Sequence, residues 1–220
     1  MSKIAHHPES ETLAAYASGS LSAALGIVIG SHLEMCAVCR AEVARLESVG
    51  GSLIDRLTPA PISAARREQI FAQLDAGLGE SAEPLSAAPV TQPTSQLPTP
   101  LRHFFAVETY DQLPWRWIGP GVRLLSIDCG EGKLVMLNIG AGRKMPVHSH
   151  RGNELTMILQ GGYSDALGHF DVGDVADLDS RVEHQPVADA DINCICVAGL
   201  DDKLQFKGWL ARMLQPFVGL

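Results

Sequence analysis

The chain has 220 residues, of which 46% are hydrophobic, and it carries a formal net charge of -8. This composition provides enough apolar material for one large globular domain or two small ones. Binding to a nucleic-acid backbone requires clustered lysine and arginine, and the sequence has no such cluster, so direct binding to DNA or RNA is disfavoured. A basic protein partner agrees better with the acidic balance.

No stretch of the sequence suits a secretory signal or a membrane span. The N-terminal "MSKIAHHPESE" lacks an apolar run, and "LSAALGIVIG" (21–30) has about half the length that a transmembrane helix needs. The sequence has five cysteines, and an odd number is more typical of metal binding in a reducing compartment than of a disulfide framework. We therefore expect a cytoplasmic protein that does not associate with membranes.

The first part of the chain is predicted to be helical. One helix spans "ESETLAAYASG" and a second follows in "SLSAALGIVIGSHLEM". A third, "AEVARLESVGG", is expected to end at its two glycines, and a fourth, "PISAARREQIFAQLDAG", begins near Pro61. The prediction is a small helical bundle over residues 1–78. Such a bundle is marginally stable without a crosslink, because short chains bury proportionally little surface.

The composition changes after this helical part. Residues 79–102 are rich in Pro, Ser, Thr and Gln without an apolar period, which predicts an extended linker. Over residues 103–220, short apolar runs such as "GKLVMLNIG" and "INCICVAG" alternate with Gly and Asp turns, which is typical of a β-sandwich or barrel. The predicted fold class is therefore α + β with two domains, a helical domain followed by an all-β domain.

The first candidate metal site lies in "HLEMCAVC". On a helix, His32 and Cys36 share a face, and Cys39 follows about one turn later, so two thiolates and an imidazole converge. A closed zinc site needs four ligands. The N-terminal "AHHP" offers the fourth: His7 is preferred because the following proline holds it extended, and His6 remains the alternative.

The surrounding stretch "HHPESETLAAYASGSLSAALGIVIGSHLEMCAVCRAEV" resembles the zinc-binding anti-sigma domain, whose mark is His-x-x-x-Cys-x-x-Cys with an upstream histidine. The resemblance covers about the first 80 residues. It implies that the helical domain holds zinc and binds a sigma factor of the extracytoplasmic-function class, which it keeps away from core RNA polymerase. The residues that match the ligands of this family are His7, His32, Cys36 and Cys39.

The second candidate metal site lies in "GRKMPVHSHRGNELTMILQG" (142–161). On a strand, His148 and His150 point to the same side, and Glu154 on the returning strand faces them. Two imidazoles and a carboxylate form most of a site for a first-row metal. A later histidine is expected to complete it. His184 is preferred over His169, which precedes a Gly-Asp turn.

This stretch matches the first motif of the cupin superfamily, a resemblance that covers about residues 104–216 and implies a jelly roll, or double-stranded β-helix. The second cupin motif is degenerate: "DVGDVADLDSRVEH" keeps Gly173, Asp174 and His184 but lacks the usual Pro-x-Gly. The resemblance implies zinc or another divalent metal in this domain. Its ligands would be His148, His150, Glu154 and His184.

The order of a zinc anti-sigma domain, a proline-rich linker and a cupin resembles the ChrR family of anti-sigma factors. This resemblance implies that the helical domain inhibits an extracytoplasmic-function sigma factor. It also implies that the cupin is needed for release under oxidative stress, caused by singlet oxygen or a related species, and that each domain holds zinc.

Two other functions are weighed against this one. A metal-dependent cupin enzyme of the dioxygenase or isomerase type would need an open coordination position and a general acid or base, and no such group stands beside the site. A DNA-binding regulator is disfavoured by the acidic charge. We therefore expect a protein that is not an enzyme.

Cys194 and Cys196 are interpreted as packed strand residues, and Cys129 as a thiol without a visible partner.

Overall fold

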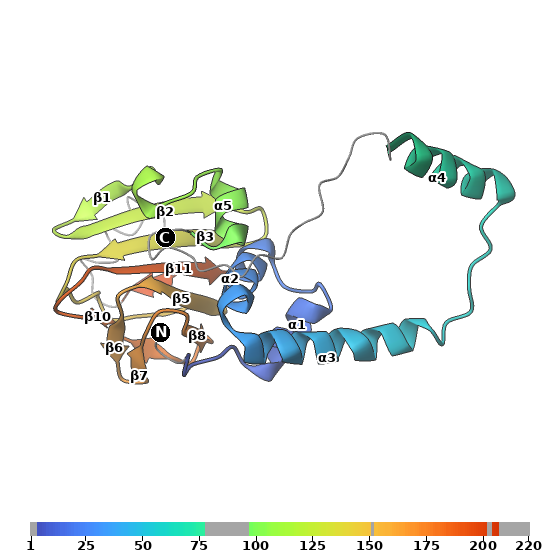
Figure 1. The fold of residues 1–220 in the computed structure, drawn as a ribbon. Coiled ribbons are helices and arrows are strands. Elements are labelled where there is room, and N and C mark those ends of the chain that lie inside the picture. The colour runs from blue at the N-terminus through green and yellow to red at the C-terminus, as the bar shows by residue number, and fades with distance from the viewer. Residues whose placement is uncertain (1–3, 78–96, 151, 202–203, 207–220) are drawn as a thin grey trace.

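The computed structural model describes residues 4–77, 97–150, 152–201 and 204–206. Its helices are α1 (Ser10–Ala17), α2 (Ala23–Met35), α3 (Ala37–Ile54), α4 (Ala64–Gly77) and α5 (Thr99–Phe105), followed by the 3-10 turn η1 (Tyr110–Gln112). The described chain after η1 consists of strands and the loops between them (Figure 1). The helical first part and the β-rich second part agree with the predicted fold class.

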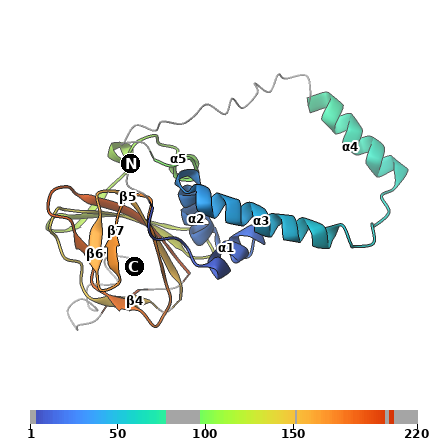
Figure 2. The ribbon, with the colours of Figure 1, turned by 60° about the horizontal axis from the view of Figure 1, so that its bottom comes forward.

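The strands are β1 (Arg116–Gly119), β2 (Val122–Asp128), β3 (Lys133–Ile139), β4 (His148–His150), β5 (Glu154–Gln160), β6 (Tyr163–Asp165), β7 (Gly168–Phe170), β8 (Val175–Leu178), β9 (Glu183–His184), β10 (Val187–Ala188), β11 (Cys194–Leu200) and β12 (Leu204–Phe206). They form a six-stranded sheet in the order β1-β2-β3-β11-β5-β8 and two three-stranded sheets, β10-β6-β7 and β12-β4-β9. Figure 2 shows the small sheets facing the large one, as in a sandwich.

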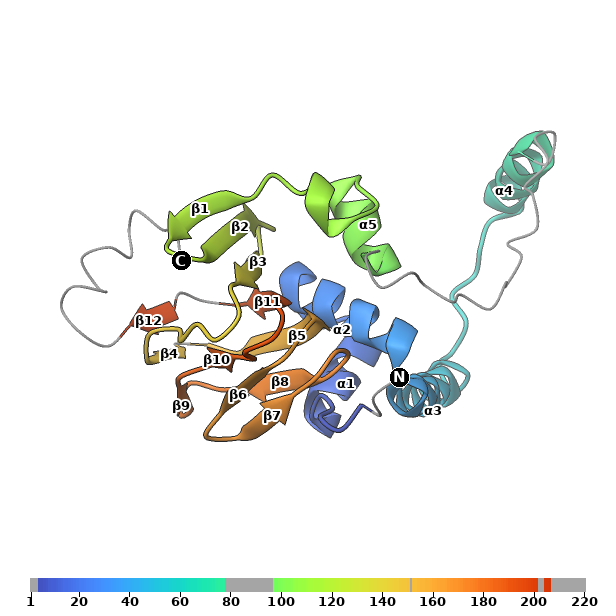
Figure 3. The ribbon, with the colours of Figure 1, turned by 60° about the vertical axis from the view of Figure 1, so that its left-hand side comes forward.

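Helix α2 packs across one face of the six-stranded sheet (Figure 3). Its Val28 and Ile29 belong to the same buried cluster as Met136, Met157 and Val197 of the central strands. The helical and β parts therefore share one core, whereas the sequence suggested a bundle with a core of its own. The reason is that "AALGIVIG" is apolar on more than one side, so α2 has enough apolar surface to face both its neighbouring helices and the sheet.

The central strands are buried on both faces. All seven residues of β11 are buried, because alternate side chains face α2 on one side and the interior of the sandwich on the other. Ile158, Cys194 and Cys196 belong to the cluster on the interior side. This explains the continuous apolar runs of the sequence, which a half-exposed sheet would not need.

Two helical predictions are wrong in detail. Helix α3 runs through Gly50 and Gly51 to Ile54, because one or two glycines cost a helix only about 1 kcal/mol each. Helix α4 forms but does not join the bundle: residues 51–76 are all exposed, and Figures 1 and 2 show α4 far from the other helices. We call residues 49–74 the exposed arm. Its exposed large apolar residues are Val49, Leu53, Ile54, Leu57, Ile62, Ile70, Phe71 and Leu74.

The predicted linker is shorter than expected. Leu97 and Leu101 are fully buried, and α5 packs against α2, so residues 97–102 belong to the folded part. Residues 78–96 lie outside the described residues. Among the described helices no single one is both long and apolar enough to cross a membrane; α2 and α3 reach that threshold only together, and they are bent by 119°.

Candidate metal centres

The four residues predicted for the helical site lie together where the N-terminal segment meets α2 and α3. The Nδ1 atom of His7 is 3.4 Å from the Sγ atoms of both Cys36 and Cys39. His32 completes the group, and the four possible ligand atoms lie within 4.8 Å of one another. The bend between the helices makes this possible, because Cys36 both ends α2 and caps α3, where its Sγ accepts a hydrogen bond from the Cys39 N–H.

His6 points elsewhere, so the geometry favours His7. Neighbouring residues of an extended segment project to opposite sides. The His6 ring stacks on Phe170 with centroids 4.2 Å apart, and its Nε2 lies 3.0 Å from the carbonyl oxygen of His169. It is therefore held at the edge of the β part, away from the two cysteines.

The donor set and its protonation suit zinc. Nδ1–H of His32 donates to the carbonyl of Gly173 at 2.8 Å, which leaves its buried Nε2 without a hydrogen-bond partner and directed at the cluster. Burial lowers the pKa of His32, so the imidazole is neutral, as a metal ligand must be. In a tetrahedral zinc site, nitrogen and sulfur ligands lie about 3.6 Å apart, close to the observed distances from His7. The cluster can bind zinc.

A bound cation would favour deprotonation of the thiols. Burial raises the pKa of Cys39 to about 12, and its hydrogen bond with Cys36 and the charge of that neighbour add to the shift. The group is therefore a protonated thiol at neutral pH until a positive charge favours the thiolate. A bound zinc ion supplies that charge.

The second candidate centre lies inside the β-sandwich. His148 on β4 and His184 on β9 are directly opposite in the strand register, and their Nε2 atoms are 3.1 Å apart. Glu154, at the start of β5, lines the same small cavity of about 50 Å³ and accepts a hydrogen bond from Thr156 at 2.7 Å. All three candidate ligands are buried. The structure thus brings three of the four predicted residues to one cavity.

The hydrogen bonds of the two imidazoles indicate which nitrogens face each other. Nδ1–H of His148 donates to the carbonyl of Pro146 at 2.8 Å, and Nδ1–H of His184 donates to the carboxylate of Asp165 at 2.9 Å. In the neutral rings each Nε2 then carries a lone pair. Two lone pairs 3.1 Å apart are satisfied together by a cation between them.

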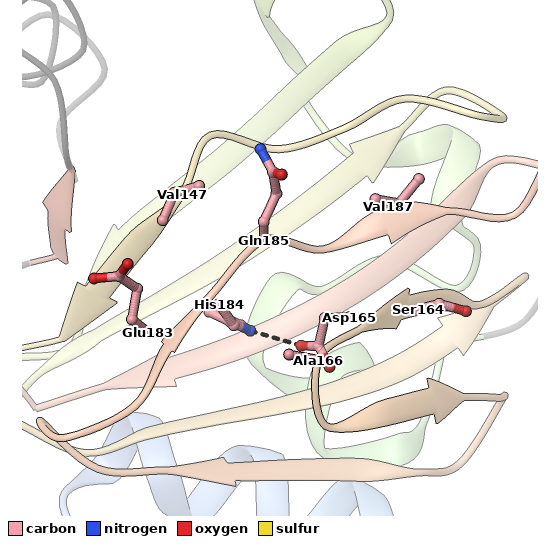
Figure 4. Close-up of a pocket in the computed structure, with 8 residues that line it drawn as sticks. All are labelled: Val147, Ser164, Asp165, Ala166, Glu183, His184, Gln185 and Val187. Atoms are coloured by element: carbon pink, nitrogen blue, oxygen red, sulfur yellow. Dashed lines mark hydrogen bonds and ion pairs between the residues drawn. The ribbon is translucent and has the colours of Figure 1, made fainter.

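Asp165 belongs to this site, although its sequence context does not predict it. It ends β6, and its side chain is almost fully buried together with that of His184, to which it is hydrogen-bonded (Figure 4). Both line a pocket of about 420 Å³ that is largely open to solvent, on the side drawn in Figure 4. In the sequence, "YSDALGH" has the composition of a tight turn, and nothing in it indicates that the carboxylate points at a histidine 19 residues later.

His150 and His169 are the other candidate ligands of this site. The backbone of His150 belongs to β4, but its side chain lies outside the described residues, so its role stays a prediction. His169 lies on β7 with an exposed side chain that contacts Ser164 and Asp171, and it does not line the cavity. The preference for His184 over His169 agrees with this placement.

The three other cysteines are all free. Cys194 and Cys196 are buried in the interior cluster, as packed strand residues are expected to be. A hydrogen bond with Cys194, and then burial, raise the pKa of Cys196, so it is a thiol and not a reactive thiolate. Cys129 is partly buried after β2, and burial raises its pKa as well.

Comparison with known proteins decides the family. A model of the ChrR cupin-like domain matches residues 104–202. The anti-sigma-E factor ChrR of Cereibacter sphaeroides is 37% identical over 215 residues, which cover 97% of this chain and 98% of that protein. The chain belongs to the ChrR family of anti-sigma factors.

A solved structure extends this relation to the whole fold. The crystal structure of Rhodobacter sphaeroides SigE in complex with the anti-sigma ChrR matches with a TM-score of 0.77 and 35% identity, over 90% of this chain and 100% of the matched chain. The agreement includes the helical part and the β part together. Membership of the ChrR family makes this chain a regulatory protein and not an enzyme.

Proposed function

We propose that this ChrR-family chain binds a sigma factor of the extracytoplasmic-function class and keeps it from RNA polymerase. The observation that carries the proposal is the exposed arm, considered together with the likeness to a chain crystallised in complex with SigE. Monomeric proteins rarely expose so many large apolar side chains within one stretch of chain unless the stretch meets a partner. No catalytic step is involved, because inhibition follows from occupying the surface of the partner.

The arm has the form of a helix-binding surface. Ile70, Phe71 and Leu74 project from α4 within an arc of about 100°, which gives one apolar stripe on an otherwise polar helix. Val49 and Leu53 add exposed apolar side chains on the outer half of α3. Because nothing in the described chain covers these side chains, burying them against a sigma factor gains free energy without breaking existing contacts.

Zinc at His7, His32, Cys36 and Cys39 would support this surface from its base. The ion would join the N-terminal segment to both helices at the bend, and so fix the direction in which α3 leaves the body of the molecule. The zinc supplies only structural crosslinking here, since all four positions of a tetrahedral site are filled by protein ligands.

The cupin part is proposed to receive the signal. Its centre would hold zinc or another divalent metal through His148, Glu154, His184 and the side chain of His150. Oxidative stress, caused by singlet oxygen or a related species, would alter this centre and lower the affinity for the sigma factor. A signal can shift the equilibrium only if it favours the free state over the bound state. The division into residues 1–78, which bind, and residues 103–220, which sense, is part of this proposal.

A cytoplasmic location follows from the proposed partner, since a sigma factor acts where RNA polymerase works. The test is co-expression with a sigma factor of the SigE type from the same genome. We expect a one-to-one complex that resists salt better than an electrostatic complex would, because the arm is apolar. Failure of the two folded proteins to associate at micromolar concentrations would overturn the proposed function.

A further inference from the structure

The turn between β7 and β8 of the cupin part contacts His32 of the helical zinc site and the N-terminal segment that carries His7. The carbonyl oxygen of Gly173 accepts the Nδ1–H of His32 at 2.8 Å, in a buried position. A zinc-bound imidazole commonly donates its other N–H to a carbonyl or a carboxylate, which fixes the ring and strengthens its bond to the metal. Here the group that performs this role belongs to the other half of the chain.

The same turn holds the segment that carries His7. The carboxylate of Asp174, which is 2% exposed, accepts hydrogen bonds from the backbone N–H groups of Ala5 and His6 at 2.7 and 3.0 Å. The N–H of Val175 donates to the carbonyl oxygen of His6 at 3.1 Å. Asp174 also accepts from the N–H of Asp171 at 2.9 Å, which fixes the turn itself.

Gly173 is required at its position for two reasons. Its φ of +94° lies in the region that side chains disfavour, and a Cβ would lie 2.9 Å from two side-chain carbons of Ile4. An alanine would therefore strain the turn whose carbonyl oxygen contacts His32, and it would displace the side chain of Ile4, three residues before His7. Gly173 thus lets the turn lie directly against the side chain of Ile4 in the N-terminal segment.

From these contacts we infer that Asp174 and Gly173 of the cupin part are positioning residues of the helical zinc site, so that its metal affinity depends on the conformation of the cupin. This rests on zinc binding at His7, His32, Cys36 and Cys39, as proposed above. A carboxylate is suited to the task because it accepts several backbone N–H groups at once.

The turn is also connected to the second candidate centre. Strand β7 leads directly into it, and β7 pairs with β6, where Asp165 lies opposite Gly168. Asp165 in turn contacts His184. The β6–β7 hairpin and the turn that follows it therefore join the cupin centre to the helical site. A movement of this hairpin would displace the groups that position His32 and the segment carrying His7.

The experiment titrates cobalt(II) into the purified, metal-free full-length chain. Thiolate-to-cobalt charge-transfer absorption reports the cysteine-containing site, because the cupin candidates are imidazoles and a carboxylate. For Asp174→Ala and Gly173→Ala we expect cobalt affinity at this site to fall at least tenfold, with altered ligand-field bands. The matched control is Asp179→Ala, which removes a partly exposed carboxylate paired with Arg181 in the same part of the chain and should leave both readouts unchanged.

The outcomes separate this inference from the proposed function. Asp174→Ala with wild-type affinity and spectrum, in a chain that retains its circular dichroism, would overturn the inference. If Asp174→Ala does not fold, Asp174→Asn replaces it, because the amide keeps one acceptor oxygen and should show a smaller loss in the same direction. A wild-type chain without charge-transfer absorption would overturn the zinc site and this inference with it. Failure to bind a sigma factor would overturn the proposed function alone.

Discussion

Replacing Phe71 by alanine tests the exposed arm at its largest side chain. Phe71 is 57% exposed and lies on the apolar stripe of α4. Because this ring is exposed among the described residues and alanine is the better helix former, its removal should leave the free energy of unfolding almost unchanged. The whole cost should therefore appear in the free energy of binding to the sigma factor.

The magnitude follows from the exposed area. A phenylalanine that buries 57% of a surface of about 200 Å² removes about 110 Å² from water, which corresponds to about 2.8 kcal/mol. The methyl group of alanine retains part of this area, so we expect a loss of about 2 kcal/mol, or roughly a 30-fold higher Kd.

The assay is isothermal titration of the sigma factor with the wild-type chain, with Phe71→Ala and with the matched control Gln69→Ala. Gln69 lies on the opposite face of α4, where its amide oxygen accepts a hydrogen bond from Arg66 at 3.0 Å. The control should bind like the wild type. If Phe71→Ala and Gln69→Ala both bind with unchanged affinity, α4 is not part of the binding surface and the reasoning from exposure is refuted.

Three further predictions concern the metal centres. Zinc uptake by the metal-free chain at neutral pH should release at least one proton, because the raised pKa of Cys39 keeps this thiol protonated while the lowered pKa of His32 keeps the imidazole neutral. Zinc affinity should then rise about tenfold per pH unit for each proton released. Titrations in buffers of different ionisation enthalpy measure the number of protons. Asp165→Asn should weaken metal binding at the cupin centre about tenfold or more, because the amide no longer fixes the tautomer of His184 as the carboxylate does; equal metal content after dialysis against a chelator would contradict this. His148→Ala should leave sigma binding intact and abolish the response to singlet oxygen in a reporter assay, and loss of inhibition without stress would argue against the division of roles.

Local patterns in the sequence were sufficient to predict much of the fold. The strand predictions "GKLVMLNIG" and "INCICVAG" correspond to β3 and β11, because long apolar runs between turn residues have few alternatives in an all-β part. The grouping of His32, Cys36 and Cys39 could also be predicted, since ligands three or four residues apart on helical segments lie close together.

Contacts between distant parts of the chain could not be predicted in this way. The packing of α2 on the sheet is one such contact. Helical periodicity indicates which face of the helix is apolar, but it does not specify the element that the face packs against. Asp165 and Asp174 have the appearance of turn residues, because their functional contacts are to His184 and to Ala5 and His6, far away in the sequence. The extent of the exposed arm depends on the absence of contacts in the described chain, which a single sequence does not reveal.

The most direct test of the account is to measure sigma-factor affinity and zinc content together, for the wild-type chain and for the double variant Cys36→Ser, Cys39→Ser. We expect the purified wild-type complex to contain zinc bound by these cysteines, and the double variant, which lacks this zinc, to lose at least two orders of magnitude in affinity. A double variant that contains no zinc at the helical site and still binds the sigma factor as tightly as the wild type would contradict the account.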